Sequence, residues 1–251
     1  MKKLTNYPSL PASLKLFDIE KVYPQSIFEK TQCGEILVDD TENPKVALFW
    51  HYCGFANLVG AFEKEHVDEV IALMQHPIDG HSGRLVLQAG MDDRLQNMMT
   101  ADPSVLCGER YVFKHNPDKA IDIPTRKLQC EPITAENYDI LTGRIIPSFS
   151  WNSRESFLQN GFGFCIRQDR TFVACAFSAA ISSEYVDIGV ETAKEFQGNG
   201  YGKLVSSAMV EETYRRNRIP VWGCDIHNEG SMRLACSVGF EVQGTHPWYR
   251  L

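Results

Sequence analysis

The stretch Gln197-Gly198-Asn199-Gly200-Tyr201-Gly202 decides the fold of this chain. It follows a predicted strand at 185–190 and opens a segment in which apolar residues recur at helical spacing. A glycine-rich turn that opens a helix points unpaired backbone N–H groups and the positive end of the helix dipole at one spot. Such a spot attracts phosphate, and glycine suits it because a β-carbon would hold the anion away from the amides.

The spacing of the glycines excludes two common nucleotide-binding motifs. A dinucleotide fingerprint starting at Gly198 requires glycine at position 203, where the chain has Lys203. A P-loop ending in Gly202-Lys203 requires glycine at 197 and Ser or Thr at 204, where the chain has Gln197 and Leu204. The pattern that remains is Gln, any two residues, Gly, any residue, Gly.

This pattern, carried by Gln197, Gly200 and Gly202, resembles the coenzyme A loop of the GCN5-related N-acetyltransferase (GNAT) superfamily. A second motif follows in the order that the superfamily uses, an asparagine that opens a helix ending in Gly-Phe. It consists of Asn228-Glu229-Gly230-Ser231, Leu234-Ala235 and Val238-Gly239-Phe240. The resemblance extends over residues 127–251, which is a whole domain.

A narrower resemblance concerns a bacterial subgroup that includes the zwittermicin A resistance acetyltransferase. It is carried by Thr192, by Pro220-Val221-Trp222 and by Asp225 and Asn228. We therefore expect a bacterial protein of the GNAT superfamily, and we do not carry the antibiotic substrate over.

We expect an α/β fold with a mixed sheet of the α+β kind, in two domains. Residues 123–251 should form the GNAT acyl-CoA N-acyltransferase fold, preceded by a smaller mixed α/β domain at 1–122. The boundary rests on a polar segment with prolines at 115–124, which is typical of a surface linker. Strands and helices alternate similarly before it without a phosphate turn, so we consider the first half a diverged copy of the same fold.

The predicted elements follow from apolar periodicity and from capping residues. In the first half we expect strands at 46–50, 55–60, 84–88 and 110–114 and helices at 65–75 and 92–99. In the second half we expect strands at 127–133, 162–167, 172–181, 185–190, 221–225 and 241–250. Helices should begin at Ala135, after Ser153, at Gly200 and after Asn228.

The resemblance implies where acetyl-CoA binds. The strand before the turn would diverge from its neighbour and hold the pantetheine arm, the turn would hold the pyrophosphate, and an amide near Val190 would polarise the thioester carbonyl. The residues expected to contact the cofactor are Gly189, Val190, Gln197, Gly198, Asn199, Gly200, Tyr201, Gly202, Lys203, Asn228 and Ser231. For Asn228, simple capping of the following helix is the alternative.

The implied reaction is direct transfer of the acetyl group to a primary amine, which needs a base to remove a proton. Glu191 and Asp187 are the two candidates for this base, with a solvated or structural carboxylate as the alternative for each. Many relatives place a tyrosine, the usual general acid, where this chain has Ala235. That departure motivates a second hypothesis, a non-catalytic acyl-CoA-binding module. A third is a scaffold that keeps only the fold.

Composition limits the partners. A net charge of -7 argues against a general nucleic-acid binder. The longest apolar stretch, Val46–Phe62, is shorter than the roughly 20 residues of a membrane-spanning helix. Because no apolar run follows Met1-Lys2-Lys3, we expect a cytoplasmic protein. We expect a small-molecule amine as acceptor rather than a protein, and we leave open both its identity and a homodimer.

The remaining cysteines and histidines predict no further chemistry. The eight cysteines contain no C-x-x-C pair, so we expect reduced, buried thiols. His76, Asp79 and His81 lie in a segment with proline and glycine and without a third histidine nearby, so we expect no metal site. His51 and Cys53 lie among apolar residues and should pack in the core.

Overall fold

The computed structural model describes residues 1–5, 22–76, 84–119, 121 and 129–251. It divides into two compact units, of which unit 1 is Met1–Arg110 with Thr245–Leu251 and unit 2 is Tyr111–Gly244. The expected boundary at residue 122 lies outside the described residues, as do Asp79 and His81. None of the helices in the described part of the chain has both the length and the hydropathy needed to cross a membrane.

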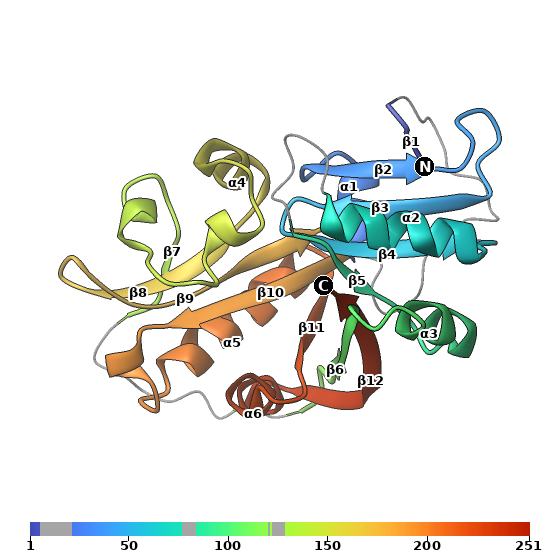
Figure 1. The fold of residues 1–251 in the computed structure, drawn as a ribbon. Helices are drawn as coiled ribbons and strands as arrows, with labels where there is room; N and C mark the ends of the chain where they lie inside the picture. The colour runs from blue at the N-terminus through green and yellow to red at the C-terminus, as the bar shows by residue number, and fades with distance from the viewer. Residues whose placement is uncertain (6–21, 77–83, 120, 122–128) are drawn as a thin grey trace. The chain divides into compact units, whose positions relative to one another are not determined.

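Unit 1 is a mixed sheet with helices packed on it (Figure 1). Its strands are β1 (Lys2–Lys3), β2 (Gly34–Val38), β3 (Val46–His51), β4 (Phe55–Gly60), β5 (Val86–Gln88) and the C-terminal part of β12 (Phe240–Arg250), in this order across the sheet. Neighbours are antiparallel except β4 and β5, which are parallel. The helices are α1 (Val22–Phe28), α2 (Lys64–Gln75) and α3 (Asp93–Thr100).

The core of unit 1 follows from the alternation of side chains along β3, where every residue is buried. Leu48 and Trp50 pack into a cluster that includes residues of α2 and α3. Phe49, between them in sequence, packs into a second cluster with Ile27 of α1. The predicted strands and helices of this half are present, whereas α1 and β2 have no counterpart in the prediction. His51 and Cys53 are buried, as expected.

Unit 2 contains the elements predicted around the glycine turn. Its strands are β7 (Glu131–Pro132), β8 (Gly163–Gln168), β9 (Thr171–Ile181), β10 (Tyr185–Thr192), β11 (Ile219–Asp225), the C-terminal part of β6 (Leu106–His115) and the N-terminal part of β12, with order β12-β6-β11-β10-β9-β8-β7. Its helices are α4 (Arg154–Asn160), α5 (Tyr201–Arg215) and α6 (Glu229–Ser237), with short 3-10 helices η1 (Tyr138–Ile140), η2 (Pro147–Phe149) and η3 (Lys194–Phe196).

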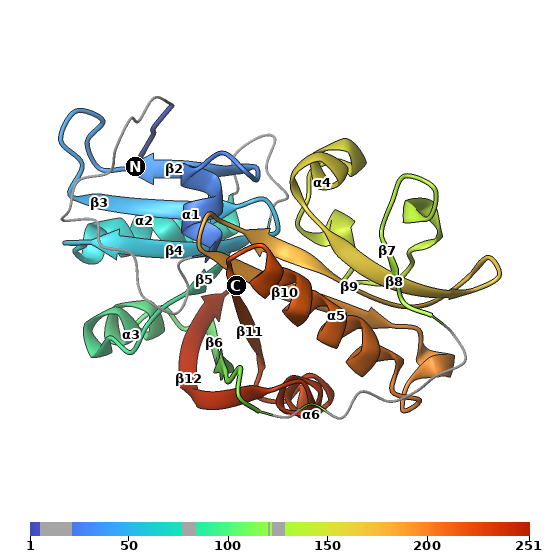
Figure 2. The same ribbon diagram turned by 180° about the vertical axis from the view of Figure 1, so that it is seen from behind.

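The core of unit 2 lies between β9 and the helices packed on the sheet. All residues of β9 after Thr171 are buried, and α5 places Val205 and Met209 against the sheet. Figure 2 shows α5 in front of β10. Trp151 is buried, and its Nε1 donates a hydrogen bond to the Ser178 carbonyl oxygen at 2.8 Å.

The helix predicted to begin at Ala135 is wrong. Residues 135–137 form a turn that leads into η1. The cause is Asn137, whose Nδ2 donates to the Pro132 carbonyl at 2.9 Å and whose Oδ1 accepts from the Thr134 amide at 2.8 Å. Asparagine side chains compete in this way with helical backbone bonds. Of the strand predicted at 127–133, only β7 is present among the described residues.

His115 is also not part of a surface linker. It ends β6 and is 7% exposed. Its Nδ1 lies 2.8 Å from the Tyr214 hydroxyl oxygen and its Nε2 lies 3.1 Å from the Val238 carbonyl oxygen. Since a carbonyl only accepts, Nε2 donates to Val238 and Nδ1 accepts from Tyr214, which is the pattern of a neutral imidazole. Burial lowers the pKa of His115 and favours this neutral form.

The cysteines are all free of disulfides, but not all are buried. Cys53, Cys165, Cys175 and Cys224 are buried, Cys130 and Cys236 are half-buried, and Cys33 and Cys107 are exposed. The expectation of burial is therefore wrong for the last two.

We predict that His115 makes the stability of the protein depend on pH. The unfolded chain binds a proton on His115 near the ordinary pKa of about 6.5, whereas the folded chain binds it only at lower pH. The free energy of unfolding should therefore fall as the pH is lowered through about 6.5, and this fall should be smaller in His115→Gln. Urea unfolding at several pH values measures it, with His227→Gln as the surface control. Equal pH dependence in wild type and His115→Gln would contradict the prediction.

Candidate functional site

The strands β10 and β11 of unit 2 run together only at their start. They pair in parallel at Tyr185, Val186 and Asp187, opposite residues 219–221, although both strands continue beyond that point. The register of β10 against β9 shifts between Asp187 and Ile188. A bulge of this kind bends a strand away from its neighbour. Residues 188–192 of β10 therefore have no partner in β11, and their backbone groups on that edge can bind an extended ligand.

The glycine turn lies just after this free edge. Gly198 and Gly200 have φ values of +77° and +82°, which are accessible to glycine at little cost. The first backbone bond of α5 runs from the Leu204 amide to the Gly200 carbonyl at 3.1 Å. Within the described chain, the amides of residues 200–203 donate no hydrogen bond to the protein. The turn therefore presents a row of unsatisfied N–H groups at the positive end of the α5 dipole.

Two side chains of the turn fix its shape. Gln197 donates from Nε2 to the Thr192 carbonyl oxygen at 3.1 Å. Asn199 donates from Nδ2 to the carbonyl oxygens of Phe196 and Gln197 at 3.2 and 3.3 Å. Both residues were expected to contact the cofactor, and the structure shows that the Gln197 side chain ties the turn to the end of β10, whereas the Asn199 side chain ties the turn to η3 and to its own start. The amide groups are thereby held in place before any ligand binds.

The other expected contacts lie around the same place. Gly189 and Val190 are in the part of β10 that has lost its β11 partner. Asn228 caps α6, because its Oδ1 accepts from the Ser231 amide at 3.0 Å. The Ser231 hydroxyl accepts from Trp222 Nε1 at 3.0 Å. The cap proposed as the alternative for Asn228 is therefore present.

The N-terminal part of α5 also approaches α6. A β-carbon added to Gly202 would lie 3.5 Å from Leu234 of α6 and 3.1 Å from the Thr192 hydroxyl oxygen. In contrast, one added to Gly198 would meet no atom within 4 Å. The space beside the first glycine of the turn is open.

The two candidate bases differ in their surroundings. The half-buried Glu191 accepts two backbone bonds at Oε2, from Arg144 at 3.1 Å and from Ile145 at 2.8 Å. Asp187, also half-buried, lies at the last position where β10 pairs with β11. Ala235, which replaces the usual tyrosine, is fully buried. The partners of Glu191 were not anticipated, since Gly143 just before them resembles an ordinary turn residue in the sequence.

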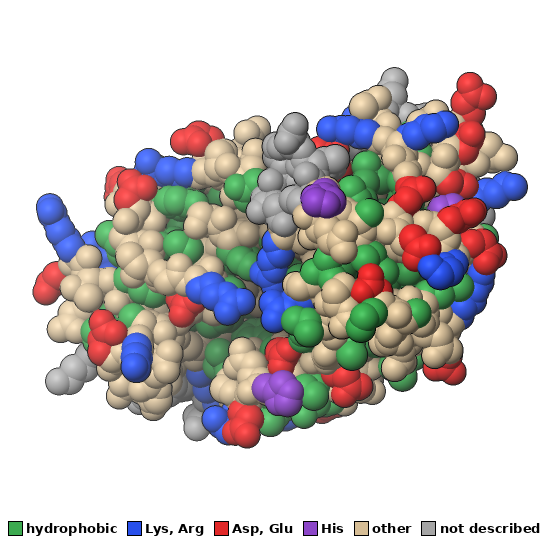
Figure 3. Space-filling model, in the orientation of Figure 1, with side chains coloured by type: hydrophobic (Ala, Val, Ile, Leu, Met, Phe, Trp, Pro, Cys, Tyr) green, Lys and Arg blue, Asp and Glu red, His purple; other side chains and the backbone are tan. Residues whose placement is uncertain are grey.

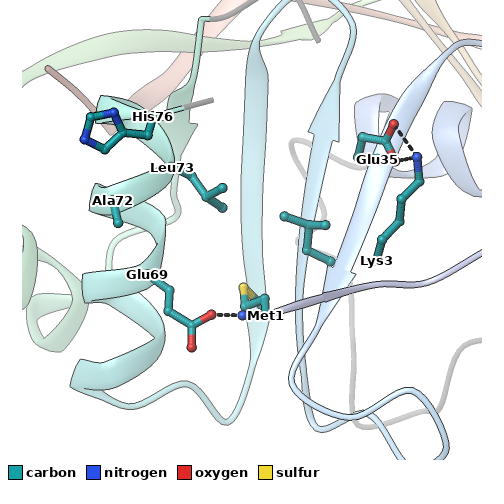
Figure 4. Close-up of a pocket in the computed structure, with 8 residues that line it drawn as sticks. Met1, Lys3, Glu35, Glu69, Ala72, Leu73 and His76 are labelled. Atoms are coloured by element: carbon teal, nitrogen blue, oxygen red, sulfur yellow. Dashed lines mark hydrogen bonds and ion pairs between the residues drawn. The ribbon is translucent and has the colours of Figure 1, made fainter. Parts of the chain in front are cut away.

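A hollow in unit 1 is unrelated to these residues. It has a volume of about 660 Å³ and contains none of the predicted site residues. Figure 4 shows that its charged groups are paired, the Met1 ammonium with Glu69 and the Lys3 ammonium with Glu35. On the face drawn in Figure 3, acidic and basic side chains are both spread over the surface. The arrangement in unit 2 is therefore the candidate site.

Comparisons with known proteins agree with this geometry. A family model described as GNAT acetyltransferase matches residues 18–249. The uncharacterized N-acetyltransferase YdfB of Bacillus subtilis is 29% identical over 92 residues. The match covers 37% of this chain and 35% of that relative, so it spans about a third of the curated protein.

Three solved structures have a similar fold. A GCN5-related N-acetyltransferase-like protein from Streptococcus suis has a TM-score of 0.69 at 21% identity, covering 91% of this chain and 93% of that one. A GCN5-related N-acetyltransferase from Kribbella flavida has a TM-score of 0.61 at 13% identity, covering 94% and 96%. A tandem GNAT protein from the clavulanic acid biosynthesis pathway has a TM-score of 0.56 at 12% identity, covering 86% and 82%.

At these identities the solved structures show the fold, and the family model, which matches nearly the whole chain, shows the family. The free edge of β10, the unsatisfied amides at the start of α5 and the capped α6 are the features that the sequence motifs predicted. The chain belongs to the GNAT acetyltransferase family.

Proposed function

We propose that the chain transfers the acetyl group of acetyl-CoA directly to a primary amine of a small-molecule acceptor. The observation that carries this proposal is the loss of pairing between β10 and β11 after Asp187, directly ahead of a turn whose amides are unsatisfied. A long ligand with an anionic middle and an amide-containing arm matches both features. Coenzyme A has this chemistry, and the open space beside Gly198 fits its pyrophosphate.

The chain's own groups then have separate roles. The amides of residues 198–203 hold the pyrophosphate, and backbone groups of residues 188–190 bind the pantetheine arm. When bound, acetyl-CoA supplies an activated thioester. The amide of Val190 is placed to stabilise negative charge on the thioester oxygen during attack. No side chain of this set needs to form a covalent intermediate.

Proton removal from the amine needs a base, for which Asp187 and Glu191 are the candidates on β10. The buried Ala235 leaves the general acid unassigned, and this favours one competing function, a non-catalytic acyl-CoA-binding module. Release of free thiol from acetyl-CoA on addition of a panel of amines distinguishes the two functions. The resemblance to the zwittermicin A resistance subgroup, a cytoplasmic location and a homodimer stay hypotheses.

We predict that Lys203→Glu weakens binding of acetyl-CoA at least tenfold without unfolding the protein. Position 203 is in the first turn of α5, where an acidic residue stabilises a helix by about 0.3–1 kcal/mol. The same charge repels a pyrophosphate held by the neighbouring amides. Calorimetric titration measures the affinity, and thermal unfolding measures the stability.

The matched control for this prediction is Lys194→Glu, which makes the same charge change in η3, outside the turn. Its affinity should stay within about threefold of wild type, because exposed charges at a distance are screened. Unchanged affinity in Lys203→Glu would show that the anion binds elsewhere.

We also predict that Asn228→Asp separates capping from cofactor binding. Aspartate caps a helix as well as asparagine does, so stability should change by only a few tenths of a kcal/mol. The side-chain amide of Asn228, which can donate to the cofactor, is lost, and we expect weaker binding of acetyl-CoA. Asn228→Ala should instead cost about 1 kcal/mol of unfolding free energy. Wild-type affinity in Asn228→Asp would leave capping as the whole role of this residue.

A further inference from the structure

The contacts of Glu191 give its Oε2 atom a structural role. Its Oε2 atom accepts from two consecutive backbone amides, those of Arg144 and Ile145. A carboxylate oxygen offers about two lone-pair sites, and here both have donors. Taking a proton from a substrate at this oxygen would break the bonds that hold residues 144–145. The Glu191 side chain of β10 thus holds the loop that connects η1 to η2.

The loop is shaped to receive this side chain. Gly143 has a φ of +125°, and a β-carbon on it would lie 2.6 Å from Cγ of Glu191. The backbone therefore approaches the glutamate more closely than any other residue type would allow. Two independent features, the paired amides and the close approach at Gly143, place the loop on the Glu191 side chain.

The position of Glu191 along β10 gives this contact a functional meaning. Glu191 follows Val190, whose amide is proposed to stabilise charge on the thioester oxygen. The loop at 143–146 is therefore fastened one residue from the proposed point of reaction. A displacement of this loop would therefore act directly beside the proposed point of reaction.

We propose that Glu191 is a positioning residue, which fastens the loop at 143–146 beside the reacting end of β10 and so shapes the acceptor site. This inference rests on the acyltransferase function proposed above. It leaves Asp187 as the candidate base on this strand.

The test compares Glu191→Gln, Glu191→Ala and the control Glu184→Gln, which changes an exposed glutamate just before β10. Deuterium uptake by the peptide containing residues 143–146 is measured in each whole protein. Uptake should rise in Glu191→Ala, rise less in Glu191→Gln, whose side-chain oxygen still accepts, and stay unchanged in the control. This readout is independent of activity, so it holds even if the proposed function fails.

The functional readout uses an amine found active in the thiol-release panel. We expect Glu191→Ala to raise KM for the amine about tenfold, Glu191→Gln to restore most of this loss, and the pH profile of kcat to be unchanged. A loss of kcat of about 100-fold in Glu191→Gln, with the loop still protected, would make Glu191 the base and overturn the proposal. Unchanged uptake in Glu191→Ala would overturn it as well.

A second, independent observation concerns unit 1, which repeats the chain order of unit 2. In the first half the order is β1, α1, β2, β3, β4, α2, β5, α3, β6. In the second half it is β7, the helices η1, η2 and α4, then β8, β9, β10, α5, β11, α6, β12. The strand directions also match, because the fourth and fifth strands of each half are the parallel pair. The last strand of each half contributes residues to the other unit.

In unit 1 both features of the candidate site are closed by the chain itself. The connection from β4 to α2 is only residues 61–63 and contains no glycine. Glu63 is the N-cap residue of α2, its amide donates to His66 Nδ1 at 3.0 Å, and its carboxylate forms an ion pair with Arg94, so a carboxylate lies at the start of the helix. The buried Asn57, directly after the last paired residue of β4, donates from Nδ2 to the Gln88 carbonyl oxygen at 3.1 Å.

We infer that unit 1 is a diverged copy of the same fold whose cofactor site is closed by Glu63 and Asn57, so that each chain binds one acyl-CoA. The inference rests on the proposed function for unit 2. Deuterium exchange of the whole protein with and without acetyl-CoA tests it. Protection should appear in residues 197–205 and not in residues 61–67, and calorimetry should give one site per chain.

Two results would overturn the inference that the unit 1 site is closed. One is protection of residues 61–67, and the other is wild-type affinity for acetyl-CoA in Lys203→Glu. A failure of the proposed function looks different, because it removes protection from residues 197–205. Glu63→Gln provides a matched variant, which keeps a capping side chain but removes its charge. Because Asn57 still bridges β4 and β5 in this variant, the chain should still bind one acetyl-CoA with unchanged affinity.

Discussion

The divergence of β10 from β11 after Asp187 is the constraint on which the rest of unit 2 depends. A strand that loses a partner in the middle of a sheet leaves backbone donors and acceptors to be satisfied by water or by a ligand. β10 tolerates this because β9 continues to pair with it as far as Thr192, and β9 is buried almost throughout. One edge of the strand is thus held rigidly while the other stays open.

The start of α5 extends the same principle from a strand to a helix. Its first amides also lack partners, Gln197 ties the turn to the end of β10, and Asn199 bonds back to Phe196 and Gln197. Beneath them, Val205 and Met209 fix α5 against the sheet. Unsatisfied backbone groups of β10 and of the start of α5 therefore lie close together, and the packing of both elements holds them in place. Preorganised donors of this kind need little rearrangement when an anion or a developing negative charge arrives.

The sequence predicted what depends on local spacing and missed what depends on distant partners. The glycine turn, the helix that follows it and the Asn228 cap are each encoded within a few residues, and all three are present. The link from Glu191 to residues 144 and 145 joins segments far apart in the chain, so no local pattern could reveal it. The helix expected at Ala135 failed because the Asn137 side chain takes the bonds of the turn. His115 was taken for linker because its hydrophobic surroundings come from α5 and β12.

The contrast between the two units shows how small a change separates a binding site from a structural element. Both units have a parallel strand pair joined by a helix whose first amides need acceptors. In unit 1 Glu63 places a carboxylate at the helix start, and Asn57 bridges β4 and β5 where their pairing ends. In unit 2 glycines lie at the helix start, and neither the first amides of α5 nor the free edge of β10 has a partner among the described residues. A self-satisfied helix start gains stability from its own carboxylate, whereas an unsatisfied one gives up that stability and gains affinity for an external anion.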